Sequence, residues 1–258
     1  MKRLERDISG IYVLWLREVK RFKRATSRVI SSIFQPIFWF VTFGFGFGGA
    51  VRFSTISSDY MSFLAPSILV MTVFSTSLMG GISVIWDREF GFLREILVAP
   101  ISRTAISIGR TLGVSTTAVI QGTVVLMIEL LIVRVNLGLT SVLFTFGVMF
   151  LIAFISSALG VLIASMMRST EGFGFIMTFI NFPLIALGGV FFPVSQLPEF
   201  LRILSFIDPL TYGTDLIRYV MMGFSELPPL LDLTALLSYS VITISLSSYM
   251  FRRTTVEA

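Results

Sequence analysis

The sequence predicts an all-α polytopic membrane protein that forms a single domain over residues 1–258. Hydrophobic residues make up 55% of the chain and charged residues only 14%, and the mean hydropathy is +0.89. A soluble domain of this length would need a far more polar surface. Long segments with few charges also alternate with short charged ones, as expected for helices that cross a bilayer and for the connections between them.

Six membrane-spanning helices are expected, because six apolar runs are each long enough to cross the hydrocarbon. The fourth run is longer than one upright span requires, so part of it should be tilted or belong to a turn at residues 136–139. Polar side chains within the runs are few. The expected spans are residues 29–51, 60–86, 105–133, 135–167, 172–198 and 230–251.

Residues 1–28 carry nine basic residues and are expected to form an interfacial helix. Apolar side chains recur at helical spacing among the basic ones, which is typical of a helix that lies in the membrane surface with its basic side toward anionic headgroups. A plain flanking segment that only sets the orientation of the chain is the alternative. The apolar positions are Ile8, Ile11, Tyr12, Trp15, Val19 and Phe22.

Residues 86–103 form a short, densely charged segment between two apolar runs. As one helix, it would place Trp86, Phe90, Leu93 and Leu97 on one apolar face. Asp87, Arg88, Arg94 and Glu95 would lie elsewhere on the helix, and Pro100 would end it. The pattern predicts an amphipathic helix at the membrane surface whose polar side faces a cytosolic partner. A helix that merely joins two spans is the alternative.

Residues 191–222 are expected to be re-entrant rather than a span, because Pro193, Pro198 and Pro209 interrupt them. One short helix should begin near Pro198 and end near Asp208, and a second should begin near Leu210. Asp215 and Arg218 have the i, i+3 spacing of an ion pair. The segment could form a gate, or it could be an inert cap.

The basic residues are distributed unequally between the two sides of this topology. Sixteen lie in the termini and in the loops on their side, and four lie on the other side. The positive-inside rule therefore predicts cytoplasmic termini, a cytoplasmic 86–103 segment and an outer 191–222 segment. Topology accounts for the high isoelectric point, so no nucleic-acid partner is expected.

The residue types that are missing argue against an enzyme. The chain contains neither Cys nor His, which excludes disulfides, Cys/His zinc sites and nucleophile–His dyads. Its three lysines (Lys2, Lys20 and Lys23) do not follow a glycine, so the chain has no phosphate-binding loop for ATP. A protein of this kind must take its energy from another subunit or use none.

Three polar residues within the expected spans are candidates for a substrate path. Gln121 and Asn181 are expected to form hydrogen bonds between helices. Glu129 lies near the outer end of its span and close to Arg134 in the sequence, so it has either an interfacial, structural role or a role in ion or substrate handling.

Two segments resemble the hallmark motifs of ABC-2 type transporter permeases. The first is D-R-E-F-G-F-L-R-E-I-L-V-A-P-I-S-R, which is similar to the family's cytoplasmic coupling region. The second comprises L-G-G-V-F-F-P-V-S-Q-L-P and I-D-P-L-T-Y-G-T-D-L-I-R, which are similar to the outer segment between the last two spans. The coupling motif is matched by Asp87, Arg88, Glu89, Phe90, Gly91, Arg94 and Glu95, and the outer motif by Phe192, Pro193, Leu197, Pro198, Pro209, Leu210 and Tyr212.

The resemblance implies the membrane subunit of an ABC exporter in the plasma membrane (the cell inner membrane). Such a permease pairs with a second copy or a paralogous permease, and with two copies of a separate ABC ATPase that binds ATP and Mg²⁺. The permease itself needs no cofactor. The first motif lacks the Y-F-P-R-E-I-L-P run of polysaccharide exporters and looks more like the drug-resistance and nodulation-factor exporters. The implied substrate is hydrophobic or amphipathic: drug-like, lipid or glycolipid. An ATP-independent secondary transporter or channel is the alternative.

Overall fold

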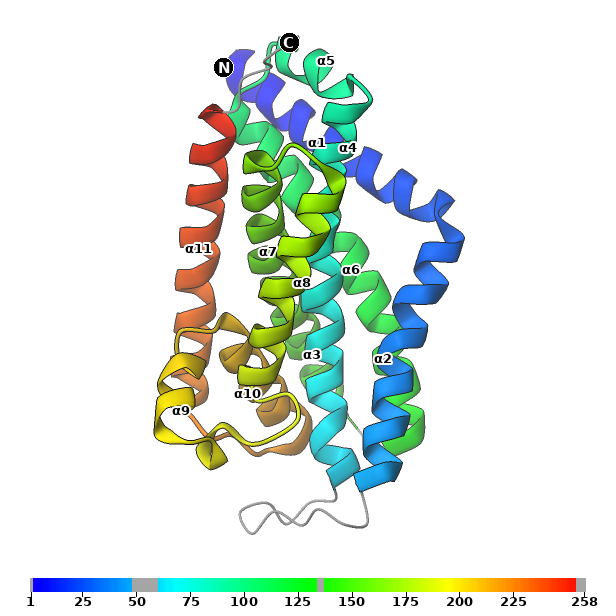
Figure 1. Ribbon diagram of the computed structural model, residues 1–258, viewed down its shortest axis with the longest axis vertical. Coiled ribbons are helices and arrows are strands. Elements are labelled where there is room, and N and C mark those ends of the chain that lie inside the picture. The colour runs from blue at the N-terminus through cyan, green and yellow to red at the C-terminus, as the bar shows by residue number, and fades with distance from the viewer. Residues whose placement is uncertain (1, 48–59, 134–136, 254–258) are drawn as a thin grey trace.

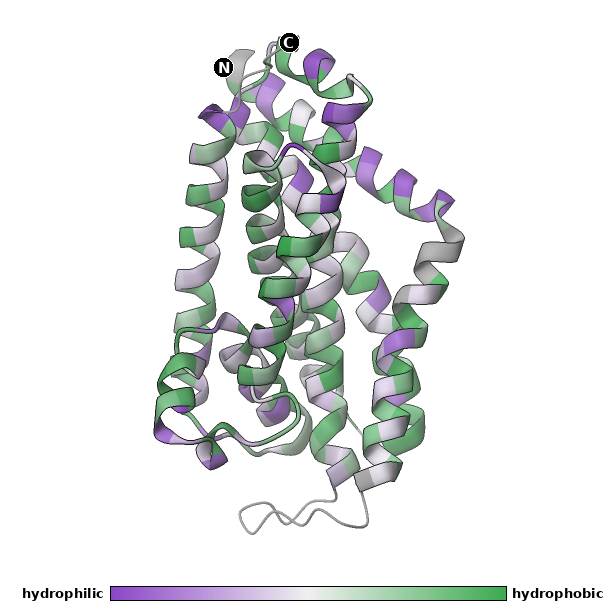
Figure 2. Ribbon diagram, in the orientation of Figure 1, coloured by the Kyte–Doolittle hydropathy of each residue, from purple (hydrophilic) through white to green (hydrophobic). Residues whose placement is uncertain are grey.

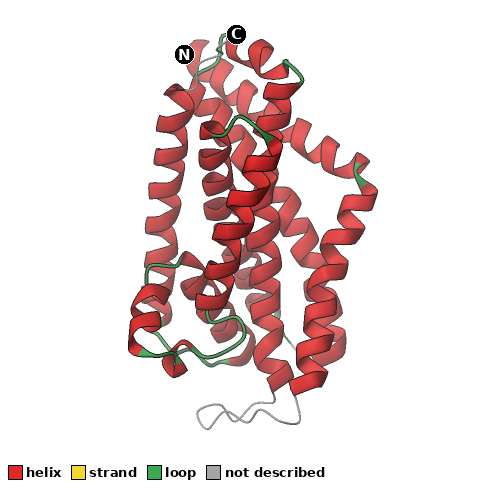
Figure 3. Ribbon diagram, viewed as in Figure 1, coloured by secondary structure: helices red, strands yellow, loops and turns green. Residues whose placement is uncertain are grey.

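The structure, a computed structural model, describes residues 2–47, 60–133 and 137–253. Helices make up most of these residues, no strand is found in them, and the connections are short (Figure 3). In order, the helices are α1 (Lys2–Arg24), α2 (Thr26–Phe47), α3 (Tyr60–Gly80), α4 (Ile82–Glu89), α5 (Phe92–Val98), α6 (Arg103–Val133), α7 (Leu139–Met166), α8 (Thr170–Leu187), the 3-10 turn η1 (Val194–Gln196), α9 (Glu199–Ser205), α10 (Pro209–Met222) and α11 (Pro229–Arg253).

Five helical segments of the described chain are long and apolar enough to cross a membrane. They are α3 together with α4, then α6, α7, α8 and α11. The first expected span corresponds to α2, whose apolar stretch Ile33–Gly46 is shorter, and residues 48–51 lie outside the described part of the chain. The all-helical polytopic architecture is therefore confirmed, and the number of six spans stays a prediction.

The bundle has different elements at its two ends (Figure 1). The start of α1, the end of α11 and the α4–α5 pair lie at one end, and α9 and α10 lie at the other. Hydrophobic residues dominate the long helices, whereas hydrophilic ones gather on α1 and on α4 and α5 (Figure 2). The structure thus places the termini and the expected coupling segment together, opposite the expected outer segment.

The centre of the bundle consists of α3, α6 and α7, with α11 and α10 packed against α7. Membrane helices associate through close packing and interhelical hydrogen bonds, because lipid is as apolar as their side chains. Buried serines supply such bonds between α6 and its neighbours: Ser115 pairs with Ser157 of α7 at 2.9 Å, and Ser107 pairs with Ser247 of α11 at 3.0 Å. Gly81 and Gly160 let the α3–α4 junction approach the backbone of α7.

The expected helix boundaries hold for most spans and fail for the fifth. The helix α8 ends at Leu187, well before Pro198, because Gly188 and Gly189 follow it and Gly189 adopts a left-handed φ of 69°. The turn expected at 136–139 is confirmed at Leu137 and Gly138, and Asn136 lies outside the described residues.

The N-terminal segment is a helix as expected, but its two faces are not the expected ones. Leu14 and Glu18 are buried, whereas Ile8 and Tyr12 are more than half exposed. Trp15 donates a hydrogen bond from Nε1 to Thr116 of α6 at 3.0 Å. The helix α1 therefore packs on α6, and its position at the membrane surface stays a prediction.

We predict that Gly160→Ala destabilises the protein by about 1–3 kcal/mol, because the new methyl group would overlap the main-chain oxygen of Leu78. The matched control is Gly147→Ala on the same helix, where a methyl group meets nothing within 4 Å. This control should be neutral or stabilising by up to about 1 kcal/mol. Thermal unfolding of the purified protein in detergent measures both, and equal shifts in Tm would contradict the packing described.

Candidate functional site

The charged segment 86–103 is broken into two helices, so the prediction of one continuous amphipathic helix is wrong. The helix α4 ends at Glu89 and α5 begins at Phe92, and between them Gly91 adopts a left-handed φ of 77°. Glycine takes this conformation at little cost and commonly ends helices in this way. The proposed apolar face therefore does not exist: Leu93 is 2% exposed, whereas Phe90 is 79% exposed.

Asp87 is the centre of a buried ion cluster rather than part of an exposed polar face. Its side chain is buried, and its carboxylate accepts hydrogen bonds from three arginines. Arg17 and Arg21, one turn apart on α1, approach at 2.9 Å and 3.0 Å, and Arg110 of α6 approaches at 2.5 Å. One carboxylate on α4 thus ties this helix to α1 and α6. Arg17 and Arg21, two of the nine basic residues of the N-terminal segment, thus bind a carboxylate of the same chain.

The charges of the cluster depend on one another, because each would be strongly destabilising if it were buried alone. Arg110 is fully buried, and its Nε and Nη1 have no hydrogen-bond partner among the described residues. A buried guanidinium without a counter-charge is strongly destabilising. Asp87 supplies that charge, and Glu18 contributes a second acid 3.6 Å from Arg21. The positions of α1, α4 and α6 are therefore mutually dependent.

The next two residues of the motif bind the turn between α7 and α8. Arg88 donates hydrogen bonds to the main-chain oxygens of Ser165 (3.2 Å) and Met167, where the unpaired carbonyls of α7 lie. Glu89 accepts hydrogen bonds from the main-chain N–H and the hydroxyl of Thr170 at the start of α8. A cation at a helix C-terminus and an anion at an N-terminus are both favoured by the helix dipole.

The rest of the motif lies in the α4–α5 connection and on the surface of α5. Phe90, Gly91, Arg94 and Glu95 are exposed. The ring of Phe92 lies 4.8 Å from the guanidinium of Arg17, which connects α5 to α1. The motif thus consists of an anchoring part, Asp87 to Glu89, whose side chains bind other helices, and an exposed part that begins at Phe90.

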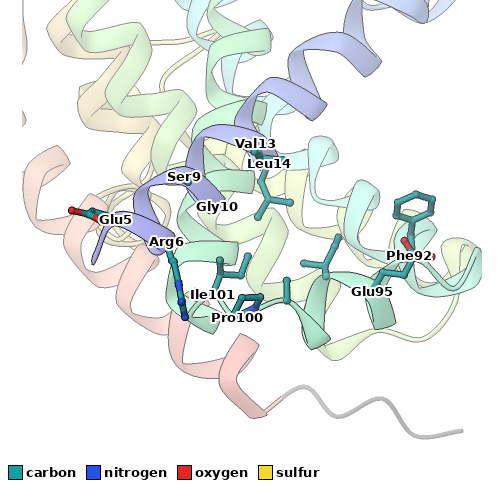
Figure 4. Close-up of a pocket in the computed structure, with 12 residues that line it drawn as sticks. Glu5, Arg6, Ser9, Gly10, Val13, Leu14, Phe92, Glu95, Pro100 and Ile101 are labelled. Atoms are coloured by element: carbon teal, nitrogen blue, oxygen red, sulfur yellow. The ribbon is translucent and has the colours of Figure 1, made fainter. Parts of the chain in front are cut away.

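A pocket of about 580 Å³ lies between α1 and α5 at this end of the molecule (Figure 4). Its walls are mainly apolar, and Glu5, Arg6 and Glu95 add charges to its lining. The apolar walls include Val13, Leu14, Phe92, Ile96, Pro100 and Ile101.

The outer segment contains the two short helices that the sequence predicts, α9 and α10. Asp208 caps α10 by accepting a hydrogen bond from the N–H of Leu210 at 2.9 Å, and Pro209 occupies the first position of the helix. Tyr212 donates its hydroxyl proton to the main-chain oxygen of Phe206 at 2.7 Å. These bonds fix the angle between α9 and α10.

The residues of the outer motif divide into buried and exposed groups. Pro193, Pro209, Leu210 and Tyr212 are buried and shape the fold. The remaining members are Phe192 and Pro198, which are exposed, and Leu197, which is half-buried.

Asp215 and Arg218 bind other groups rather than one another, so their predicted ion pair does not form. Asp215 accepts hydrogen bonds from main-chain N–H groups of the α10–α11 loop. Arg218 is 1% exposed and donates to Ser67 and to the main-chain oxygen of Gly189, both at 2.6 Å. Its guanidinium also lies 3.8 Å from the centre of the Phe63 ring. Arg218 thereby joins α10 to α3, a link that its sequence spacing does not reveal.

The three polar candidates within the spans have different surroundings. Asn181 of α8 accepts a hydrogen bond from Ser75 of α3 at 3.1 Å, so its expected interhelical bond is confirmed. Gln121 donates to the main-chain oxygen of Thr117 in its own helix. Glu129 is 2% exposed, and its carboxylate has no hydrogen-bond partner in the described part of the chain. Arg134 lies outside that part.

The described acidic side chains were compared with the arrangements that hold metal ions. Over the ranges that the structure describes, no group of three or more His, Cys, Asp or Glu residues is arranged to hold a metal ion.

Comparison with known proteins matches this architecture to a family. A family model described as ABC-2 type transporter matches residues 9–222. A Cyanophora paradoxa protein named as the transport permease ycf38 is 33% identical over 218 residues, which cover 83% of this chain and 74% of the relative. The inner membrane transport permease YadH of Escherichia coli K12 is 26% identical over 217 residues, covering 83% and 84%. An Escherichia coli K12 protein named as the multidrug ABC transporter permease YbhR is 31% identical over 198 residues, covering 76% and 53%.

We predict that Asp87→Asn destabilises the protein by about 3–5 kcal/mol, because Arg110 would stay buried without its counter-charge. Glu95→Gln on α5 is the matched control: it also neutralises an acid of the motif, but at an exposed position, and should change stability by less than about 0.5 kcal/mol. Thermal unfolding in detergent compares the two variants. A loss for Asp87→Asn no larger than that for Glu95→Gln would contradict the buried cluster.

We also predict that the protein loses stability as the pH rises toward 8. Burial raises the pKa of the Asp208 carboxyl from its usual 3.8 to about 8, against the smaller effect of its bond to Leu210. The folded state therefore binds a proton that the unfolded state has released, and this contribution is complete below pH 3.8 and is lost as the pH rises through about 8. Asp208→Asn keeps the helix cap and should flatten this part of the Tm–pH curve. A variant with the same curve as the parent would show that Asp208 is ionised in the folded state.

Proposed function

The chain belongs to the ABC-2 type transporter family as a multi-pass membrane transporter permease, and on this premise we propose that it is the membrane subunit of an ATP-driven exporter. ATP and Mg²⁺ bind to a separate ABC ATPase, because this chain has no phosphate-binding lysine. Two ATPase copies serve a pair of permeases. The observation that carries the proposal is the Asp87 cluster, which joins a surface element to membrane helices.

In this proposal the ATPase contacts the exposed part of α5 and the adjoining part of α1. Phe90, Arg94 and Glu95 are available there, and the apolar pocket between α1 and α5 offers a complementary surface. Movement of α5 would reach α1 through Arg17 and Phe92. A movement of α4 would be transmitted to α6 through Asp87. It would be transmitted to the end of α7 through Arg88 and to the start of α8 through Glu89. Packed elements held in this way transmit rigid-body shifts.

The membrane surface of α8 supports a pairing of two permeases. Phe175, Phe179 and Phe182 follow one another at i, i+4 and i+7 and are each about three-quarters exposed. We propose that this stripe faces the second permease, which is either another copy or a paralogue, and lines an apolar route for a hydrophobic or amphipathic substrate. Gln121, Glu129 and Asn181 stay candidates for a polar contact along that route.

The proposed direction is out of the cytoplasm across the plasma membrane. Sixteen of the twenty basic residues occur in residues 1–28, in residues 88–110, at Arg168 and at the C-terminal end of α11, which favours a cytoplasmic location for the end that carries α4 and α5. The α9–α10 segment at the other end would then gate the exit, with Phe192, Leu197 and Pro198 at its accessible surface.

The alternative of an ATP-independent secondary transporter or channel makes a different prediction. Transport by the purified chain alone, without nucleotide hydrolysis and without a copurifying ATPase, would support that alternative and contradict the exporter.

We predict that the double variant Arg94→Glu/Glu95→Arg lowers ATP-driven transport at least about tenfold, equivalent to about 1.4 kcal/mol of coupling, while the protein still folds. Both side chains are exposed, so the loss would come from the ATPase contact. The matched comparison is Glu199→Arg/Arg202→Glu on α9, the same exchange of exposed charges far from the proposed ATPase contact, which should leave the stimulation of ATP hydrolysis by the permease unchanged. Transport and ATPase rates in reconstituted vesicles measure the effect. Equal activity of the two double variants would refute the assignment of α5.

A further inference from the structure

Residues 190–207 form a strap that leaves the bundle after α8 and returns to it at α10 (Figure 1). The strap contains η1 and α9, and α9 packs on α8. Little of α9 is buried: Ser205 is its one buried residue, whereas Phe200 and Ile203 are 70% and 59% exposed. A short helix that buries so little surface gains little free energy from packing on the protein. The position of the strap therefore depends strongly on hydrogen bonds from the rest of the chain.

Both ends of the strap are held by side chains of neighbouring helices. Next to its first residue, Arg218 of α10 donates a hydrogen bond to the main-chain oxygen of Gly189 at 2.6 Å. At its last three residues, hydroxyl groups of α10 and α11 donate to successive main-chain oxygens at 2.7, 2.7 and 2.8 Å. The two ends of the strap are thus fixed to these helices. The three hydroxyl donors are Thr211, Tyr212 and Tyr239.

Between these ends, Glu226 of the α10–α11 loop holds the middle of the strap. Its carboxylate accepts hydrogen bonds from the main-chain N–H of Val194 at 3.1 Å and of Ser195 at 2.7 Å. Bonds to a charged acceptor are stronger than bonds between neutral groups. The bond to Ser195 is exposed, so water can take the place of the carboxylate there when the strap moves away. The contact is therefore strong and can still be broken without leaving that N–H unpaired.

The loop that carries Glu226 is itself held in place. Asp215 of α10 is 4% exposed, and its carboxylate accepts hydrogen bonds from the main-chain N–H groups of Glu226 at 2.9 Å and Leu227 at 2.8 Å. Gly223 ends α10 with a left-handed φ of 71°, and Pro229 begins α11, so the loop is short. Because the loop is fixed to α10, the strap is the side of this contact that can move.

We propose that Glu226 is a clasp that keeps the strap closed against the bundle, and that the strap opens when the carboxylate leaves the N–H groups of Val194 and Ser195. The fixed ends are the hinges, and the first of them adjoins Gly189, whose φ of 69° a glycine can change at little cost. Opening exposes the side chain of Val194, which is 8% exposed in the closed strap. The role of the clasp in an exit gate rests on the proposed function, whereas the clasp itself needs no ATPase.

The accessibility of a single cysteine tests the clasp directly. The chain has no native cysteine, so Val194→Cys places one buried thiol in the middle of the strap. Its rate of reaction with a water-soluble maleimide is measured on the full chain in lipid nanodiscs. Glu226→Ala should raise this rate about tenfold or more, because both bonds to the strap are lost. Glu226→Gln keeps one accepting oxygen and should give an intermediate rate.

Two controls separate opening of the strap from general loss of structure. Glu199→Ala removes an exposed acid at the start of α9 and should leave the reaction rate of Val194→Cys unchanged. Val84→Cys places a thiol at a 0% exposed position of α4, at the opposite end of the bundle, and should stay unreactive when Glu226→Ala is added. An unchanged rate at Val194→Cys in Glu226→Ala, or equal increases at both cysteines, overturns the proposal.

Transport in reconstituted vesicles tests the gating role of the clasp separately. With the ATPase present, Glu226→Ala should lower transport per ATP hydrolysed at least about twofold, because an exit that does not close lets substrate return. Faster labelling with unchanged transport would overturn the role of the clasp in the exit gate. The labelling result holds whether or not an ATPase drives the chain, so a failure of the clasp can be told apart from a failure of the proposed function.

Discussion

The arrangement of this permease depends on one buried carboxylate that neutralises arginines from two other helices. Asp87 accepts hydrogen bonds from Arg17, Arg21 and Arg110, and the burial of Arg110 makes those bonds necessary. A change in the position of α4 therefore changes the surroundings of α1 and α6 together. Arg88 and Glu89 extend the same constraint to the α7–α8 turn. The short helix α4 thus connects α1, α6 and the α7–α8 turn at one end of the bundle.

The two ends of the molecule use buried charge in different ways. At the α4–α5 end, arginines outnumber the acids and form direct ion pairs. At the α9–α10 end, Asp208, Asp215 and Asp232 are buried with one nearby cation, Arg218, which binds other groups. The first end is suited to a rigid connection, whereas at the second end burial raises the pKa of Asp208 to about 8, so that its charge depends on the pH.

Much of the fold could be predicted from the sequence, because the signals for membrane helices are local. Apolar runs and Pro209 at the start of α10 are read directly from neighbouring residues. The end of α8 was predicted too late, because Gly188 and Gly189 were not taken as a stop signal. The division at Gly91 was missed because the spacing of Trp86, Phe90, Leu93 and Leu97 suggested one helix, although a glycine after a charged turn is itself a stop signal. The partners of Asp87 could not be predicted, since Arg17 and Arg21 are 70 and 66 residues away in the sequence. The sequence pattern of charged residues on one face of a helix is the same whether that face binds a partner protein or another helix of the same chain.

The central claim is that α1 and α5 move as one body because Asp87, Arg17 and Phe92 hold them together. The absence of native cysteine allows two spin labels to be placed without background, one at Lys20 on α1 and one at Val98 on α5, both exposed. Pulsed electron resonance would then measure the distance between the labels in the assembled transporter with and without ATP. The account predicts one narrow distance distribution that ATP does not change, and a broad one after Asp87→Asn. A distance that shifts with ATP while Asp87 is intact would contradict the account.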